Sequence, residues 1–220
     1  MKRISVLSLL IVFAFAKFSF AQKAEKAFEG QISYTIEYLG EMDPATKAQA
    51  PTAIDMYFKG SKARMEQSTA MGKAIVISDN QTMEQIVLLD MLGNKWAIKS
   101  TKEETEKVLA ESPKATVTIT EETKTIAGVT CKKAEVTVDE KTETFWFTNE
   151  VKVDKPNWNM PWSEINGVLM EYVQAQGDIS MKIVAKEIKK SKLKDIIFTA
   201  TSDYQMMTSE EFRSMFGGGE

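Results

Sequence analysis

Three adjacent acidic pairs are the residues of this sequence best suited to acid–base chemistry. They are Glu121-Glu122, Asp139-Glu140 and Glu210-Glu211. Two carboxylates that flank a glycosidic bond can hydrolyse it, and the members of such a pair need not be adjacent in sequence. Each of the three pairs lies in a predicted turn or at a predicted helix start, where carboxylates are normally solvated. The pairs therefore leave a glycosidase open but do not indicate one.

Histidine is absent from the sequence. A chain without histidine has no Ser-His-Asp or Cys-His catalytic site, and it lacks the usual ligand sets of zinc. Clustered glycines occur only at 217–219, so the sequence has no glycine-rich loop that could hold phosphate groups. We therefore predict a protein that is not an enzyme and that has no metal ion and no cofactor.

The sulfur-containing residues offer two further kinds of chemistry. Met206-Met207 places two thioethers side by side, but this spacing does not suit a copper site and no other soft ligands accompany them. The 13 methionines indicate either ordinary core packing or an apolar surface that adapts to varied ligands. Cys131 is the single cysteine, so no internal disulfide can form. We predict that its thiol is buried in a strand, with an intermolecular bridge as the alternative.

Two tryptophans lie in an irregular segment, 152–166, that also contains Pro156 and Pro161. Proline is excluded from central strands, so this segment is predicted to be a loop. Trp158 and Trp162 then either pack the loop over the edge or core of a sheet, or cover a pocket as a lid. Both interpretations remain open from the sequence.

The elements that must position these residues are mainly strands. Ile32, Tyr34, Ile36 and Tyr38 alternate with polar residues, which predicts a strand with one buried face. Similar short alternating runs recur along the chain, among them two or three strands within 123–148, a hairpin around Gln176-Gly177-Asp178 and a last strand at 196–198. This spacing predicts about ten or eleven antiparallel strands in one sheet.

Helices are predicted to be few and short. Residues 101–112 are rich in Glu and Lys and poor in apolar residues, which favours a solvent-facing helix. Thr208 and Glu211 have the spacing of a capping box that opens a second helix. Residues 40–51 are interpreted as a loop or a short helix.

The N-terminus has the features of a signal peptide. Lys2 and Arg3 precede an apolar run at 4–16, and Ser19-Phe20-Ala21 supplies the small residues of a cleavage site. We predict a signal peptide at 1–21, a single β-rich domain at 22–216 and a loose tail at 217–220. No cysteine comes directly after the cleavage site, so we expect an exported protein, periplasmic or secreted, that is not a lipoprotein and has no membrane span after cleavage.

The net charge of −3 and the lack of a basic block argue against nucleic acid as a partner.

Six segments of the chain are recognisable in their order along the sequence. They are FEGQISYTIEY, YFKGSKARME, TKTIAGVTCKKAEV, FWFTNE, INGVLMEY and DIIFTATSDYQMMTSEEF. Together they resemble a family of exported proteins of Gram-negative bacteria that is similar to the GLPGLI family. INGVLM stands where the name motif of that family lies, with Asn166 in place of its proline.

The resemblance implies a fold like that of the periplasmic lipoprotein carriers LolA and LolB. In such a fold a strongly curved antiparallel sheet forms half a barrel, and a few short helices lie on its concave side. It implies no catalytic residues.

We expect the protein to bind a hydrophobic ligand, a lipid or an acylated molecule, on the concave face of this sheet. The candidate ligand-binding residues are Tyr34, Ile36, Met56, Phe58, Trp158, Trp162, Met181 and Ile183. The alternative is a protein-interaction module of the cell envelope that uses a sheet edge or the Trp158/Trp162 loop. A cavity of several hundred Å³ is expected for the first function, and a filled interior with an exposed aromatic patch for the second.

Overall fold

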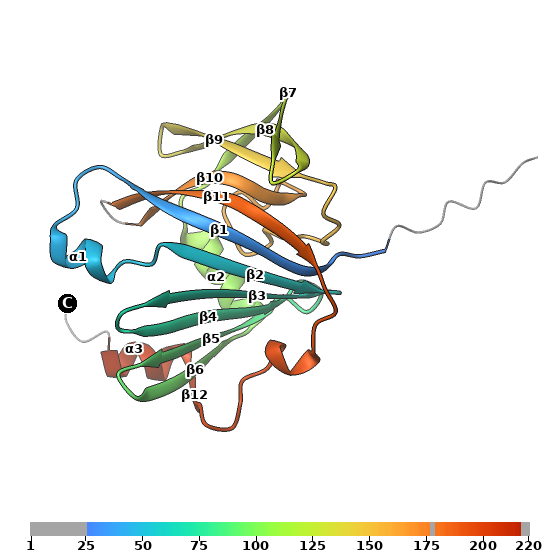
Figure 1. Cartoon of the computed structure of the whole chain (residues 1–220). Coiled ribbons are helices and arrows are strands. Elements are labelled where there is room, and N and C mark those ends of the chain that lie inside the picture. Colours follow the sequence, from blue (N-terminus) through green and yellow to red (C-terminus); the bar gives the residue numbers. More distant parts are fainter. Residues whose placement is uncertain (1–25, 177–178, 217–220) are drawn as a thin grey trace, which may run out of the picture.

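The computed structural model describes residues 26–176 and 179–216, which form one 12-stranded sheet with short helices (Figure 1). The strands are β1 (Glu29–Leu39), β2 (Ala53–Lys59), β3 (Lys62–Thr69), β4 (Gly72–Asp79), β5 (Glu84–Met91), β6 (Asn94–Ser100), β7 (Thr116–Ile126), β8 (Val129–Val138), β9 (Lys141–Thr148), β10 (Val168–Gln176), β11 (Ile179–Lys190) and β12 (Gln205–Thr208). The helices are α1 (Pro44–Gln49), α2 (Lys102–Glu111), α3 (Ser209–Phe216) and the 3₁₀ helix η1 (Asp195–Phe198).

The sheet consists of two antiparallel meanders. Strands β1 to β6 follow one another in one meander and β7 to β11 in the other, and the pairing of β1 with β11 joins them. Figure 1 shows the resulting sheet as an open, curved surface. The prediction of a mainly β protein with a curved, half-barrel sheet and a few short helices is therefore confirmed. The one parallel pair, β12 with β6, was not predicted.

Side-chain alternation gives the sheet two different faces. On β1, Ile32 and Tyr34 are buried on the inner face, which we define as the face that carries Tyr34, Met56 and Met65. Gln31 and Ser33 point to the outer face, where both donate hydrogen bonds to Asp55 of β2 (2.8 and 2.6 Å). The alternation predicted for this strand is therefore confirmed.

Side-chain caps determine where the helices begin. In α2, Thr101 Oγ1 accepts from the Glu104 backbone while the Glu104 carboxylate accepts from the Thr101 N–H. The same reciprocal pair links Thr208 and Glu211 at the start of α3, as the capping-box spacing predicted. At α1, Asp43 accepts from two backbone N–H groups, which shows that this ambiguous segment forms a helix.

The last predicted strand, at 196–198, is wrong. These residues form η1, and Phe198 packs on the outer face of β4, β5 and β6 against Ile75, Ile77 and Leu88. The pattern failed because a short apolar run reads the same whether it is a strand or a buried helical turn. The strand of this region is instead Gln205–Thr208, beside β6.

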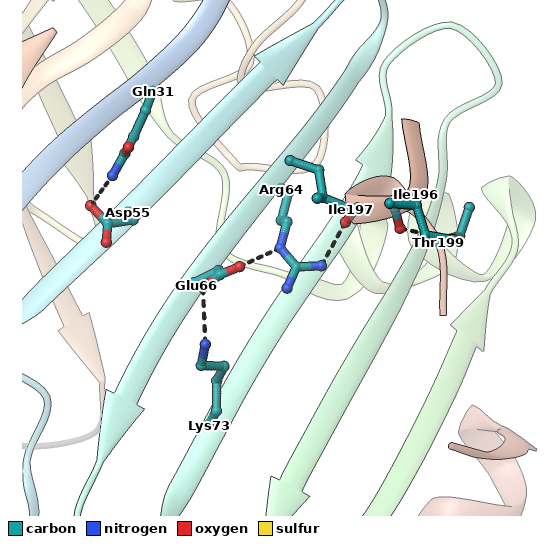
Figure 2. A network of polar contacts seen from close by, with 8 residues as sticks. All are labelled: Gln31, Asp55, Arg64, Glu66, Lys73, Ile196, Ile197 and Thr199. Carbon is teal, nitrogen blue, oxygen red and sulfur yellow. Dashed lines mark hydrogen bonds and ion pairs between the residues drawn. The ribbon is translucent and has the colours of Figure 1, made fainter. Parts of the chain in front are cut away.

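The segment around η1 is attached to the sheet by polar contacts (Figure 2). Arg64 Nη1 of β3 donates to the Ile197 carbonyl (2.6 Å), and Arg64 also forms an ion pair with Glu66, which in turn pairs with Lys73. Lys59 of β2 donates to the Leu193 carbonyl (2.7 Å). We call residues 193–200 the outer strap, because they cross the outer face between β11 and β12.

Three predictions lie outside the described residues: the signal peptide at 1–21, the tail at 217–220 and the turn at 177–178. The strands on either side of that turn, β10 and β11, do pair as the predicted hairpin. Among the residues that the structure describes, no helix is long and apolar enough to cross a membrane.

Candidate functional site

A cavity of about 880 Å³ lies on the inner face of the sheet. Its floor is formed by side chains of β1 to β5, β10 and β11 that alternate toward this face, such as Met56, Met65, Val76 and Met181. Residues 42–51, which include α1, line one side, and residues 156–162 of the loop between β9 and β10 line another. The volume falls in the range of small-molecule sites, which is roughly 300–1,000 Å³.

Among the residues that the structure describes, none of the side chains that line this cavity carries a charge. The lining consists of aliphatic, methionine and aromatic residues together with a few amides and hydroxyls. In a chain of which 27% of the residues are charged, this composition sets the cavity apart from the rest of the surface. An uncharged, mainly apolar wall favours a ligand that is itself neutral where it is enclosed, because burying an unpaired charge is costly.

The loop between β9 and β10 is held in place by buried side-chain hydrogen bonds. Trp158 Nε1 donates to Asn80 Oδ1 (3.0 Å), and Asn80 Nδ2 donates to the Asp154 carbonyl (2.8 Å). Asn157 Nδ2 donates to the carbonyls of Ile165 (2.7 Å) and Gly167 (3.0 Å). These contacts anchor the loop, and its residues 156–162 line one side of the cavity.

Six of the eight residues predicted from the sequence line the cavity. They are Tyr34, Met56, Phe58, Trp162, Met181 and Ile183. Ile36 is buried in the core beside β11, and Trp158 is buried against Asn80; neither is among the lining residues. Side chains of strands β1, β2 and β11 thus line one cavity, as the alternation implied. Of the two tryptophans in the loop, Trp162 lines this cavity and Trp158 does not.

The sequence analysis missed the contribution of β10. Tyr172 and Gln174 alternate on this strand toward the cavity, and the cross-strand register places them beside Ile183 and Met181 of β11. The same alternation that revealed β1 is present in β10 and was a usable signal. The contribution of α1, through residues such as Met42 and Gln49, had no comparable signal because it depends on how the β1–β2 connection folds back.

Several polar groups of the lining are already paired within the protein. Tyr34 Oη donates to the Leu169 carbonyl (3.0 Å), Tyr38 Oη donates to the Pro51 carbonyl (2.8 Å), and Asn159 Nδ2 donates to Gln85 Oε1 (3.2 Å). Burial, together with the nearby Tyr172, raises the pKa of Tyr34 well above its ordinary value, so its hydroxyl stays protonated. These groups serve the structure of the wall.

Other polar groups of the lining have no partner in the described part of the chain. Trp162 Nε1 is buried without a hydrogen-bond partner, and the Tyr172 hydroxyl and the Gln174 amide form no side-chain hydrogen bond with described residues. Burial raises the pKa of Tyr172 strongly, which keeps its hydroxyl neutral and able to donate. The cavity therefore combines an apolar floor with unused neutral hydrogen-bonding groups.

The acidic pairs lie away from this cavity. Glu122 pairs with Lys133 (2.9 Å), Glu211 caps α3, and Asp139-Glu140 forms the β8–β9 turn. Within residues 26–176 and 179–216, no group of three or more His, Cys, Asp or Glu residues is placed to hold a metal ion. Cys131 is fully buried, as predicted, and burial raises the pKa of its thiol to about 11.

Two solved structures of PNGF-II share this fold. One, in space group P21, has 16% sequence identity and a TM-score of 0.56, and the match covers 87% of this chain and 34% of that chain. The other, in space group C2, has 18% identity and a TM-score of 0.58, with 87% and 33% covered. The chain thus spans about a third of the length of the solved structures that it matches. At these identities the likeness shows the fold alone.

A weaker likeness involves LprF from Mycobacterium bovis, at 10% identity and a TM-score of 0.32, over 76% of this chain and 88% of that chain. No conclusion rests on it. A comparison with curated proteins finds no match.

The model of one protein family matches residues 60–211, which is more than half of the chain. This family is described as the N-terminal domain of N-glycanase and differs from the GLPGLI family that the sequence segments suggested. The prediction of a protein outside the enzyme class is also wrong, because the family is named for an enzyme. The absence of histidine excludes only histidine-dependent chemistry, so it did not exclude membership of an enzyme family. The chain belongs to the family of the N-glycanase N-terminal domain, PNGase F-II type.

Proposed function

We propose that this domain binds a neutral, mainly apolar ligand, such as a lipid or an acylated molecule, in the cavity of its inner face. The uncharged lining of an 880 Å³ cavity is the observation that carries the proposal. The alternative of an interaction module that uses a sheet edge or the tryptophan loop has less support, because Trp158 is buried and the interior is hollow.

The energetics favour a ligand with an alkyl or ring portion. Burial of one CH₂ group contributes about 0.8 kcal/mol, so an enclosed chain of several such groups offsets the cost of immobilising it. An ionised group placed beside Met56 or Met65 would lose its hydration without gaining a counter-charge. A charged head group, if the ligand has one, must therefore stay outside the cavity.

A change of charge on one strand tests the proposal. The probe is N-phenyl-1-naphthylamine, a neutral apolar dye, and the readout is its fluorescence on titration with the protein. Met65→Glu places a carboxylate in the cavity and is expected to weaken binding about tenfold or more. Ser68→Glu puts the same charge on an exposed position of the same strand and is the matched control.

Wild-type protein that does not bind the dye would contradict the proposal. Equal binding by the wild type and Met65→Glu, with both proteins folded by circular dichroism, would place any binding site elsewhere.

Membership of an N-glycanase domain family supports a second proposal, that the chain takes part in the release of N-linked glycans from peptides. The cavity would contribute binding to this process, because no carboxylate of the described part of the chain lines it as an acid or base. Incubation of the chain with an N-glycosylated peptide, followed by mass spectrometry, tests whether it releases glycan by itself. If the peptide keeps its glycan when the protein is present in a stoichiometric amount, the chain does not release glycans by itself.

A further inference from the structure

One wall of the cavity has hydrogen-bonding groups that the protein itself leaves unused. Phe145 of β9 contacts both Trp162 and Tyr172, with ring centroids 5.1 Å and 5.8 Å apart. Trp162 and Tyr172 also line the cavity, so the two side chains belong to the same part of its wall. We call Trp162, Tyr172 and Gln174 the polar wall.

The polar wall differs from the paired side chains of Tyr34, Tyr38 and Trp158. Tyr34, Tyr38 and Trp158 each donate their O–H or N–H to a protein oxygen 2.8–3.0 Å away. The Trp162 Nε1 and the Tyr172 hydroxyl have no such partner in the described part of the chain. A buried donor left unpaired costs about 1–3 kcal/mol, and such groups in proteins normally have a partner.

The chemistry of these groups defines what they can accept. A tyrosine that stays protonated can donate, so this part of the wall fits an acceptor oxygen. No cation within residues 26–176 and 179–216 lines the cavity, so a carboxylate would be desolvated against neutral donors alone. A neutral carbonyl oxygen meets both conditions.

Gln174 extends the polar wall along β10. It lies two residues after Tyr172 on the same face, and its amide forms no side-chain hydrogen bond with described residues. An amide both donates and accepts, so it can pair with the second polar atom of an ester or an amide group. Met56 and Met65, on β2 and β3, offer only apolar contact to the ligand.

We propose that the ligand is a neutral acyl ester or acyl amide whose carbonyl oxygen accepts a hydrogen bond from the Tyr172 hydroxyl, while its acyl chain lies on the methionine-lined floor. The buried Trp162 Nε1 has no surface open to the cavity, so Trp162 contributes its ring to the wall and not a donor. This inference rests on the proposed binding function and names the chemical class of its ligand. It selects an esterified or amidated acyl group over a free fatty acid. Tyr172 becomes the residue that determines this preference.

The test compares three probes with the same chain length: methyl dodecanoate, dodecanoate and dodecane. Each displaces N-phenyl-1-naphthylamine from the protein, and the readout is the ratio of their affinities. We expect the ester to bind most tightly. Tyr172→Phe removes only the hydroxyl and should weaken ester binding by about fivefold to tenfold without weakening dodecane binding.

Tyr38→Phe is the control, because the Tyr38 hydroxyl is already paired with the Pro51 carbonyl. It should leave the ester-to-alkane ratio unchanged even if it weakens both probes. An unchanged ratio in Tyr172→Phe would overturn the inference, and so would tighter binding of dodecanoate than of the ester. Failure of all three probes and of the dye would instead overturn the proposed binding function.

Discussion

Trp158 and Asn80, which lie far apart in the sequence, form a buried hydrogen bond of 3.0 Å between the indole Nε1 and the amide Oδ1. Asn80 lies between β4 and β5, and its own Nδ2 donates to the Asp154 carbonyl. This pair anchors the loop that walls the cavity. It also separates Trp158, whose N–H is used by the fold, from Trp162, whose N–H is unpaired.

The Trp158–Asn80 bond predicts a clear stability effect. Trp158→Phe keeps most of the apolar contact but leaves Asn80 Oδ1, in a residue that is 2% exposed, without its donor. We expect the free energy of unfolding to fall by about 1–3 kcal/mol. Urea unfolding measures this change. Asn80→Ala should cost a similar amount, and the double variant should cost less than the sum, because the two residues share one interaction. Full additivity would contradict the pairing.

The attachment of the outer strap predicts a difference between two basic residues. Arg64 is only 12% exposed and holds both Glu66 and the Ile197 carbonyl, whereas Lys73 is 44% exposed and pairs with Glu66 alone. Arg64→Met should lower stability by about 1.5–3 kcal/mol, because hydrogen bonds of charged groups are lost at a partly buried site. Lys73→Met should cost about 0.5 kcal/mol or less.

Hydrogen exchange of the Thr199 amide, which bonds to the Ile196 carbonyl, reports on the outer strap directly. Faster exchange of this amide in Arg64→Met than in Lys73→Met is expected. Equal exchange rates would show that apolar packing of Phe198 alone holds the outer strap.

Cys131 predicts a loss of stability at alkaline pH. Burial raises the pKa of its thiol from the ordinary value of 9.0 to about 11 in the folded protein. The unfolded chain therefore loses this proton first, so the thiol contributes stability that is complete below pH 9 and declines as the pH rises toward 11. Urea unfolding between pH 8 and pH 11 should show a steeper decline in the wild type than in Cys131→Ala, which lacks the titrating group. Parallel pH profiles would contradict this assignment.

The same thiol should not react with a disulfide reagent at pH 8 in the folded protein, because it is fully buried and protonated. It should react rapidly in 6 M guanidinium chloride.

Glu171 predicts a loss of stability at acid pH, whereas Cys131 predicts one at alkaline pH. Burial raises its pKa, but the hydrogen bond and charge of Lys124 (2.8 Å), helped by Lys182 (3.4 Å), lower it below the ordinary value of 4.5. The unfolded chain binds the proton first as the pH falls, so the stability that this carboxylate contributes is present above pH 4.5 and is lost below it. Glu171→Gln should lower stability at pH 7 and reduce the decline between pH 5 and pH 3. A decline as steep as in the wild type would exclude this role.

Glu187→Gln on β11 changes an exposed carboxylate by the same chemistry and is the control for surface charge. Lys124 also lies over the ring of Trp146, with Nζ 4.3 Å from the centroid. The fluorescence of Trp146 therefore offers a second readout of the same contact.

Much of the sheet was predictable because strand alternation is a local property. Ile32, Tyr34, Met56 and Phe58 occupy the inner face as their spacing indicated. The capping box at Thr208 and Glu211 was equally visible, since both of its partners lie within one helical turn. Cys131 is buried as its residue type suggested.

The failures concern relations between distant segments. The apolar run at 196–198 was predicted to be a strand, but Arg64 and the apolar patch on β4 to β6 hold it as a 3₁₀ turn on the outer face. Enzyme membership was rejected because no catalytic pattern was visible, whereas the family match rests on the chain from 60 to 211 as a whole. The position of Ile36 and Trp158 outside the cavity lining also depends on tertiary packing, and their assignment to the ligand site stays a prediction.

The sequence by itself determined the class of fold, the burial of alternate side chains and the positions of two helix starts, because these follow from spacing within a few residues. Only the tertiary structure decided that β1 pairs with β11 and that residues 42–51 and 156–162 line a hollow instead of filling it. It also decided that the described side chains around this hollow are uncharged. It also decided which tryptophan serves the fold and which remains unpaired. The physical reason is that a cavity and an unpaired donor depend on which distant groups meet, and residue spacing along the chain does not specify those meetings.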